Sequence, residues 1–173
     1  IQAVDMIPNF DVVFSLRGTT DRYSGGADLP LLLYAYDSRV DKISKVRKLF
    51  KHLHCGSTTP EGLCYEAVMN DMITTTDKMD SYFLNFSDGM PMYSNDTMYY
   101  QGDDARKHTR DMVNKMRKMG IKVLSYFIND RYYGDDSGAI NAFKEMYGSD
   151  AEEIDILSIP AVARTMNNLF LEK

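Results

Sequence analysis

Hydrophobic residues along the chain form short unbroken runs that alternate with stretches of helical spacing. The unbroken runs predict five strands, over residues 10–16, 31–36, 82–86, 121–128 and 154–157. The first two runs are separated by a short stretch that contains Gly25-Gly26, which predicts an antiparallel hairpin.

Apolar residues spaced three and four apart predict helices between these strands. The predicted helices cover residues 43–53, 59–73, 103–119, 139–147 and 159–171, and residues 1–6 have the pattern of a helix end. Thr59-Pro60-Glu61 is a favourable helix start, with a hydroxyl N-cap, proline at the first position and an acid in the first turn. Gly120 is expected to terminate the third helix, whose methionine stripe is expected to pack in the core.

The alternation of strands and helices defines the expected fold class. Strands that are apolar on both faces are typical of a sheet covered on both sides. We therefore expect an α/β protein with an open, mostly parallel, Rossmann-like sheet, helices on both faces and one antiparallel hairpin strand. A chain of 173 residues fits a single domain with a substantial core.

Charge and composition narrow the classes of partner. The formal net charge of −5 disfavours nucleic-acid and anionic-membrane partners, which need a basic face. No stretch approaches the roughly 18 apolar residues of a membrane span, and no signal peptide is visible. Two cysteines in the whole chain favour a reducing compartment, so we expect a cytoplasmic protein.

Two local clusters have an alternative functional interpretation. His52, His54 and Cys55 crowd together with Cys64 nearby, but their spacing matches no usual structural zinc pattern, and a polar helix end followed by a buried thiol is the simpler interpretation. The helix over residues 43–53 is basic, and its cations form either a solvated face or a partner-binding surface; they are Lys42, Lys45, Arg47, Lys48 and Lys51.

Oxygen-bearing side chains follow the strands at the edge where open α/β sheets bind ligands. Thr58-Thr59 open a helix, Ser87-Asp88-Gly89 follow the third strand, and Asn129-Asp130 follow the fourth. Mg²⁺ prefers about six oxygen ligands, several of them water. Each piece alone is an ordinary turn or helix cap, but their order and spacing together favour a magnesium site that includes Thr59, Ser87 and Asp88.

The order of these elements and motifs resembles a von Willebrand factor A (VWA) domain. The resemblance rests on G-S-T-T-P-E-G-L before a helix and on F-S-D-G-M-P at the end of a strand. The family's metal-ion-dependent adhesion site (MIDAS) uses a D-x-S-x-S loop, a threonine loop and an aspartate loop. By resemblance, Thr59 matches the second loop and Asp88 the third.

Within that family, the chain is most similar to the C-terminal VWA domain of cobaltochelatase T subunits. The supporting stretches are S-D-G-M-P, the helix and strand H-T-R-D-M-V-N-K-M-R-K-M-G-I-K-V, and Arg131-Tyr132-Tyr133. The resemblance covers most of residues 10–173. It implies a subunit without catalytic activity of its own that works with an AAA+ ATPase ring and a large metal-inserting subunit. Related VWA domains also occur in bacteriophages.

The chain departs from the family pattern at the first loop. No D-x-S-x-S is present; Asp11 and Ser15 lie four apart inside a predicted strand. We expect the missing strand and loop to lie upstream of Ile1, which would make residues 1–173 a single VWA-like domain truncated at its N-terminus. The alternative is a degenerate VWA domain without a full metal site.

Three functional hypotheses follow. The first is a binding module that holds Mg²⁺ and uses it to bind a carboxylate of a partner protein. The second is an α/β hydrolase that uses Asp88, although His108 at a helix start is an unconvincing partner and no G-x-S-x-G elbow exists. The third is a metal-free structural or assembly protein, for which the tyrosine-rich loop from Tyr93 to Tyr100 is a candidate contact surface.

Overall fold

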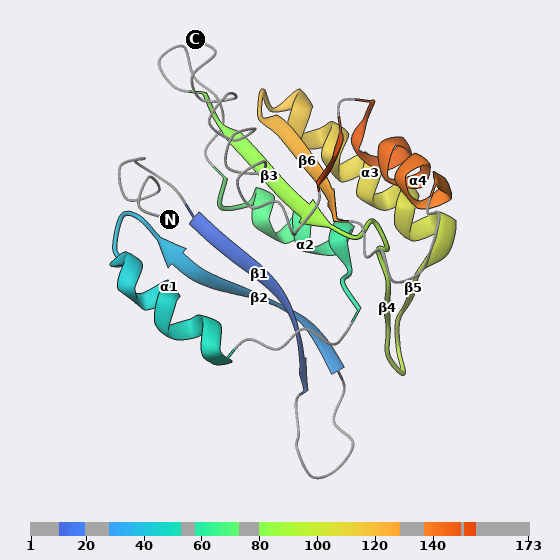
Figure 1. Ribbon diagram of the computed structural model, residues 1–173. Helices are drawn as coiled ribbons and strands as arrows, with labels where there is room; N and C mark the ends of the chain where they lie inside the picture. The colour runs from blue at the N-terminus through green and yellow to red at the C-terminus, as the bar shows by residue number, and fades with distance from the viewer. Residues whose placement is uncertain are drawn as a thin grey trace.

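The computed structural model describes residues 11–19, 28–52, 58–72, 80–128, 137–149 and 151–154. Its first two strands, β1 (Asp11–Thr19) and β2 (Asp28–Asp37), form the antiparallel hairpin that the sequence predicts. The register runs from Asp11 opposite Asp37 to Thr19 opposite Asp28, with a shift between Val12 and Val13. The hairpin is a two-stranded sheet of its own, and α1 (Ile43–Leu49) lies along it (Figure 1).

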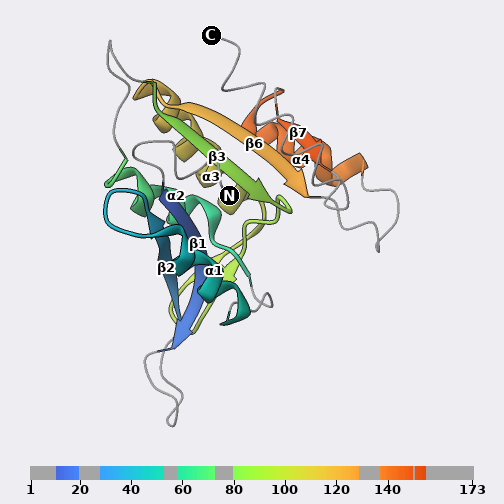
Figure 2. The same ribbon diagram turned by 60° about the vertical axis from the view of Figure 1, so that its left-hand side comes forward.

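The second sheet is parallel and has the strand order β3-β6-β7. Its strands are β3 (Tyr82–Ser87), β6 (Lys122–Ile128) and β7 (Glu152–Ile154). Tyr82 pairs with Lys122 and Ser87 with Phe127, so β3 and β6 are in register along the whole of β3. Figure 2 shows β6 between its two neighbours. The predicted α/β class with a mostly parallel sheet and an antiparallel hairpin is confirmed.

Three helices pack together against this sheet. They are α2 (Glu61–Met69), α3 (Gly102–Lys118) and α4 (Ser137–Tyr147). A short 3-10 helix, η2 (Phe50–His52), continues α1. The C-terminal helix predicted over residues 159–171, and the helix end predicted over residues 1–6, lie outside the described residues.

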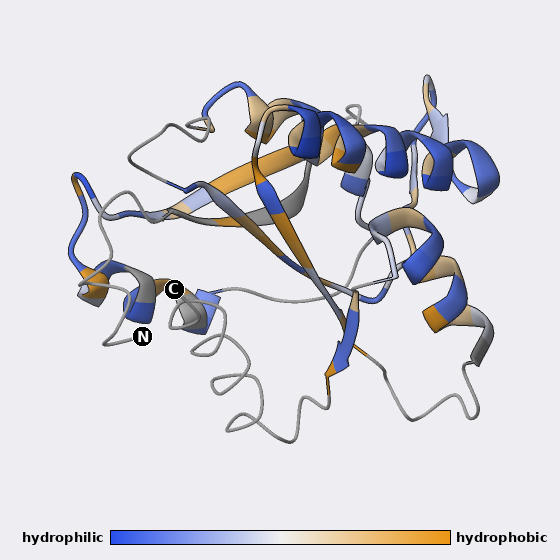
Figure 3. Ribbon diagram, turned by 90° about the horizontal axis from the view of Figure 1, so that it is seen from above, coloured by the Kyte–Doolittle hydropathy of each residue, from blue (hydrophilic) through white to orange (hydrophobic). Residues whose placement is uncertain are grey.

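The core lies where these three helices meet the parallel sheet. Its largest members come from α2, α3, β6 and α4, and include Tyr65, Val113, Met116, Phe127 and Phe143. The Phe143 ring lies 4.4 Å from that of Tyr147 and 5.3 Å from that of Phe127. In Figure 3 the polar face of α3 points away from the sheet while β6 is apolar, which is the amphipathic arrangement that buries one stripe of a helix.

The third helix behaves as its sequence predicts. Val113 and Met116 are fully buried, while Met112 and Met119 are partly buried against the same cluster. Gly120 has a φ of 81°, a left-handed conformation that favours glycine and ends helices. The methionine stripe is therefore core packing rather than a binding groove.

Several boundaries differ from the sequence prediction. The predicted Thr59 N-cap is wrong: Pro60 is the N-cap residue of α2 and no side chain caps the helix. The tyrosine-rich segment that the sequence predicts to be a loop contains a short hairpin of β4 (Tyr93–Ser94) and β5 (Tyr99–Tyr100). An Asn95 turn makes this hairpin possible, because its Oδ1 accepts hydrogen bonds from the N–H groups of Thr97 and Met98 at 3.0 and 2.7 Å.

Close contact between α2 and α3 depends on Gly62. A Cβ atom at this position would lie 2.5 Å from the Tyr100 hydroxyl, 2.6 Å from His108 Nδ1 and 3.0 Å from the backbone nitrogen of Thr109. In a helix interior, alanine is more stabilising than glycine by about 1 kcal/mol. An added group in a tightly packed site, however, destabilises the protein by about 1–3 kcal/mol. The backbone atom of Thr109 cannot move as a side-chain tip can, so the steric cost should dominate.

We therefore predict that Gly62→Ala lowers the free energy of unfolding by about 1–2 kcal/mol, measured by urea denaturation. The matched control is Gly138→Ala in α4, where an added Cβ would meet no atom within 4 Å. The control should leave stability unchanged or raise it by up to about 1 kcal/mol. Equal effects of the two substitutions would contradict the steric argument.

Candidate functional site

The two oxygen-rich turns predicted from the sequence lie side by side in the structure. Thr59 forms an isolated parallel bridge with Pro91, and its carbonyl oxygen accepts a hydrogen bond from Met92 N at 2.9 Å. These contacts join the segment that precedes α2 to the segment that follows β3. The Thr59 turn and the Ser87-Asp88-Gly89 turn therefore share the carboxyl edge of the parallel sheet, the usual ligand-binding edge of this fold class.

Gly89 shapes the second turn. Its φ of 70° is left-handed, and a Cβ there would lie 2.9 Å from Cδ2 of Phe143. Only glycine avoids both the backbone strain and this contact. The turn leaves Asp88 exposed, with its Oδ1 accepting a hydrogen bond from Met90 N at 3.1 Å.

Ser87 connects the exposed turn to a buried acid. Its hydroxyl donates to Oε1 of Glu61 and accepts from Gly89 N at 2.9 Å. A serine oxygen has two lone pairs, so one remains for a further donor or a cation after the Gly89 contact.

Glu61 is the centre of a buried hydrogen-bond chain. Its side chain is only 3% exposed, and its Oε2 accepts a hydrogen bond from the Tyr147 hydroxyl at 2.7 Å. The Tyr147 hydroxyl is also 2.7 Å from the Tyr65 hydroxyl. The carboxylate thus has donors from β3 and from α4 on its two oxygens, which is the arrangement that makes a buried acid tolerable.

Burial is the largest influence on the pKa of the Glu61 carboxyl group. Loss of solvent raises the pKa of Glu61 to about 7; the Tyr147 hydroxyl opposes the rise and the charge of Asp88 adds to it. Burial likewise raises the pKa values of Tyr65 and Tyr147, so both phenols stay protonated as hydrogen-bond donors at neutral pH.

A second hydroxyl at the first turn lacks a partner. Thr58 Oγ1 is buried and makes no hydrogen bond within the part of the chain that the structure describes. A buried hydroxyl without a hydrogen-bond partner lowers the stability of a protein by about 1–3 kcal/mol. Water or a cation that binds at this edge would therefore gain from contact with the Thr58 hydroxyl. Hydroxyl and carboxylate oxygens suit Mg²⁺, and the residues present here fit a partial site for that ion.

The three predicted metal residues lie on two segments that the Thr59–Pro91 bridge joins: Thr59 is in the bridge, Ser87 ends β3 and Asp88 follows it. The predicted Asn129-Asp130 contribution lies outside the described residues. Sequence reasoning missed the role of Glu61, which it treated only as an acid in a first helical turn. The sequence did contain a signal. Glu61 is followed by Gly62 and by Cys64-Tyr65, which are residue types that often lie on a buried helix face.

The other candidate residues have different surroundings. His108 Nδ1 is 3.1 Å from the Tyr100 hydroxyl, and its Nε2 is 4.0 Å from Glu66, so its contacts tie β5, α3 and α2 together. Cys64 is buried in the core, and His52 is exposed at the end of η2. His54 and Cys55 lie outside the described residues.

Among the described residues, no group of three or more histidine, cysteine, aspartate or glutamate side chains is arranged to hold a metal ion. Any cation at the carboxyl edge would therefore depend on hydroxyl oxygens and water in addition to Asp88. Within the same residues, no helix has the length and apolar content needed to cross a bilayer.

Comparisons with known proteins do not identify a family. No protein-family model, no curated protein and no solved structure matches this chain. Function must therefore be inferred from the residues and their geometry.

The raised pKa of Glu61 gives a prediction for stability. A glutamate carboxyl group in the unfolded chain has a pKa of 4.5, and a pKa of about 7 in the folded protein means that the folded state holds the proton more tightly. The stabilising contribution of protonated Glu61 is thus complete below pH 4.5 and is lost as the pH rises through about 7. At about 1.4 kcal/mol per pKa unit, the loss is about 3 kcal/mol.

We predict that Glu61→Gln removes this pH dependence. The amide keeps an oxygen for the Ser87 hydroxyl and carries no charge, so the stability of the variant relative to the parent should rise by about 3 kcal/mol between about pH 5 and pH 8. Urea denaturation across this range measures it. Glu152→Gln, a substitution at an exposed position of β7, is the control and should retain the parent profile. A Glu61→Gln profile parallel to that of the parent would show that this carboxyl group does not carry the effect.

Proposed function

We propose that this chain is a VWA-like protein-binding module with a partial metal-ion-dependent adhesion site. The observation that carries the proposal is the bridge between Thr59 and Pro91, which holds the hydroxyl turn against the Ser87-Asp88-Gly89 turn. Thr59, Ser87 and Asp88 would hold a Mg²⁺ ion together with water. When bound, the ion would supply a positive charge that accepts a carboxylate oxygen from a partner protein.

The protein's own residues would prepare this edge. Glu61 fixes the Ser87 hydroxyl, and Gly89 turns the backbone so that Asp88 remains exposed. Thr58 adds a buried hydroxyl without a partner among the described residues. Ser87 does contact a base, the Glu61 carboxyl group, but that group is buried and its other oxygen accepts a hydrogen bond from Tyr147. We take these features to support binding rather than catalysis, and no histidine is among the hydrogen-bond partners found for Asp88 or Ser87.

The resemblance to cobaltochelatase T subunits extends the proposal to partners. We propose a cytoplasmic subunit without activity of its own that works beside an AAA+ ATPase ring and uses neither nucleic acid nor membrane as a partner. The negative net charge of −5 supports the exclusion of extended polyanions.

A metal-free assembly protein that retains the fold is the second candidate. It is favoured by the hydrogen bonds that Ser87 and Asp88 already make within the fold, to Glu61, Gly89 and Met90. In that case the turn would serve only to close the end of β3.

Thermal denaturation with and without Mg²⁺ tests the cation site. Mg²⁺ at about 100 times its Kd should raise the free energy of unfolding by about 2.7 kcal/mol. Asp88→Asn should abolish the increase, because it removes the charge but keeps an oxygen for Met90 N. Asp96→Asn, on the exposed turn between β4 and β5, is the matched control and should respond as the parent does. No increase in the parent, or an equal one in Asp88→Asn, would contradict the proposal.

A further inference from the structure

Basic residues are concentrated in one short segment of an acidic protein. Five of the 20 lysine and arginine residues lie between Lys42 and Lys51, whereas the chain as a whole has a net charge of −5. No aspartate or glutamate occurs between Asp41 and Glu61. The segment therefore carries positive charge with few compensating acids beside it.

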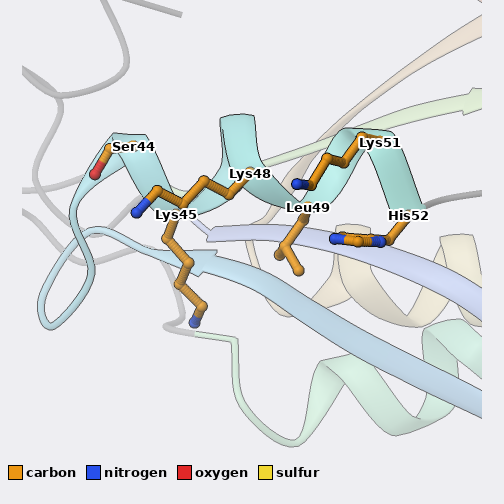
Figure 4. Close-up of a pocket in the computed structure, with 6 residues that line it drawn as sticks. All are labelled: Ser44, Lys45, Lys48, Leu49, Lys51 and His52. Atoms are coloured by element: carbon orange, nitrogen blue, oxygen red, sulfur yellow. The ribbon is translucent and has the colours of Figure 1, made fainter.

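Three of these five cations, Lys45, Lys48 and Lys51, lie along one side of α1 and η2. A hollow of about 610 Å³ beside the helix is lined by Ser44, Lys45, Lys48, Leu49, Lys51 and His52 (Figure 4). The three lysines and His52 are exposed, and Leu49 is half-buried among them. The hollow thus offers an apolar floor, made by Leu49 and lysine methylene groups, below charged groups that remain in solvent.

Most of this charge is available for a partner. Lys45 Nζ forms an ion pair with Asp41 at 2.7 Å but remains 46% exposed. Lys48 and Lys51 have no carboxylate within ion-pair distance in the part of the chain that the structure describes. An exposed ion pair such as Lys45–Asp41 is worth only about 0–1 kcal/mol, so it would not prevent Lys45 from meeting another anion.

We propose that α1 and η2 form a docking surface for a short acidic segment of a partner protein. The surface (Lys45, Lys48, Lys51 and His52) is distinct from the Thr59–Asp88 edge: in Figure 1, α1 lies on the opposite side of the hairpin from α2 and β3. The inference does not depend on the proposed cation site.

The length and charge of the surface define its occupant. Ten helical residues rise about 15 Å, which matches about four or five residues of an extended peptide at about 3.3 Å each. Charges interact strongly only within a Debye length of about 8–10 Å at moderate ionic strength. A short acidic segment on the hollow would therefore feel mainly the lysines, whereas a long nucleic acid or an anionic bilayer would also meet the acidic remainder of the protein.

The test is fluorescence anisotropy with a labelled hexaglutamate peptide at low ionic strength. The parent should bind it, and added salt should weaken the binding. Lys48→Glu combined with Lys51→Glu should weaken binding about tenfold or more. Lys107→Glu combined with Lys115→Glu is the matched control: it makes the same change in net charge at exposed positions of α3 and should change affinity less than about threefold. Circular dichroism verifies that both variants fold.

Several results would overturn the inference. The first is that the parent does not bind the peptide. The second is that both double variants bind it equally weakly. The third is that the parent binds a single-stranded oligonucleotide or phosphatidylserine vesicles more tightly than the peptide. The measurements are made with a chelator present and repeated with Asp88→Asn, which should bind the peptide as the parent does. Failure of the cation site and failure of this surface are thus separate outcomes.

Discussion

The buried carboxylate of Glu61 is the contact on which the carboxyl edge of the parallel sheet depends. It begins α2, accepts a hydrogen bond from Ser87 at the end of β3, and accepts another from Tyr147 at the end of α4. An ionised group this far from water is tolerated only when such donors replace its hydration. The hydrogen-bonding requirement of one acid therefore positions three elements that are distant in the sequence.

Two glycines let these elements approach closely enough for the contact to form. Gly62 follows the acid and allows α2 to lie against Tyr100 and His108, while Gly89 allows the turn after β3 to lie against Phe143. The motifs T-T-P-E-G and S-D-G are thus two halves of one arrangement, in which the acid of the first binds the hydroxyl of the second. Their co-occurrence in the sequence has a physical explanation that does not depend on any bound ion.

The fold was largely predictable because most strands are unbroken apolar runs and because α3 has a clear stripe of buried residues. The β4–β5 hairpin was missed, since two-residue strands have no periodicity and depend on the Asn95 turn. The approach of the Thr59 segment to the segment after β3 followed from the rule that parallel strands end at one edge. The hydrogen-bond partners of Glu61 could not be predicted, because Ser87 and Tyr147 lie 26 and 86 residues away in the chain.

The exposed acid and the buried acid of this edge are not independent. The charge of Asp88 contributes to the raised pKa of Glu61, so a positive charge that compensates Asp88 must also make ionisation of Glu61 easier. By reciprocity, ionised Glu61 must favour any cation that binds at Asp88, and protonated Glu61 must favour it less. The Ser87 hydroxyl adds a second link, because it contacts Glu61 directly and belongs to the same turn as Asp88. Whichever ligand this edge holds, its affinity should therefore reflect the buried carboxyl group as well as the exposed residues that touch the ligand.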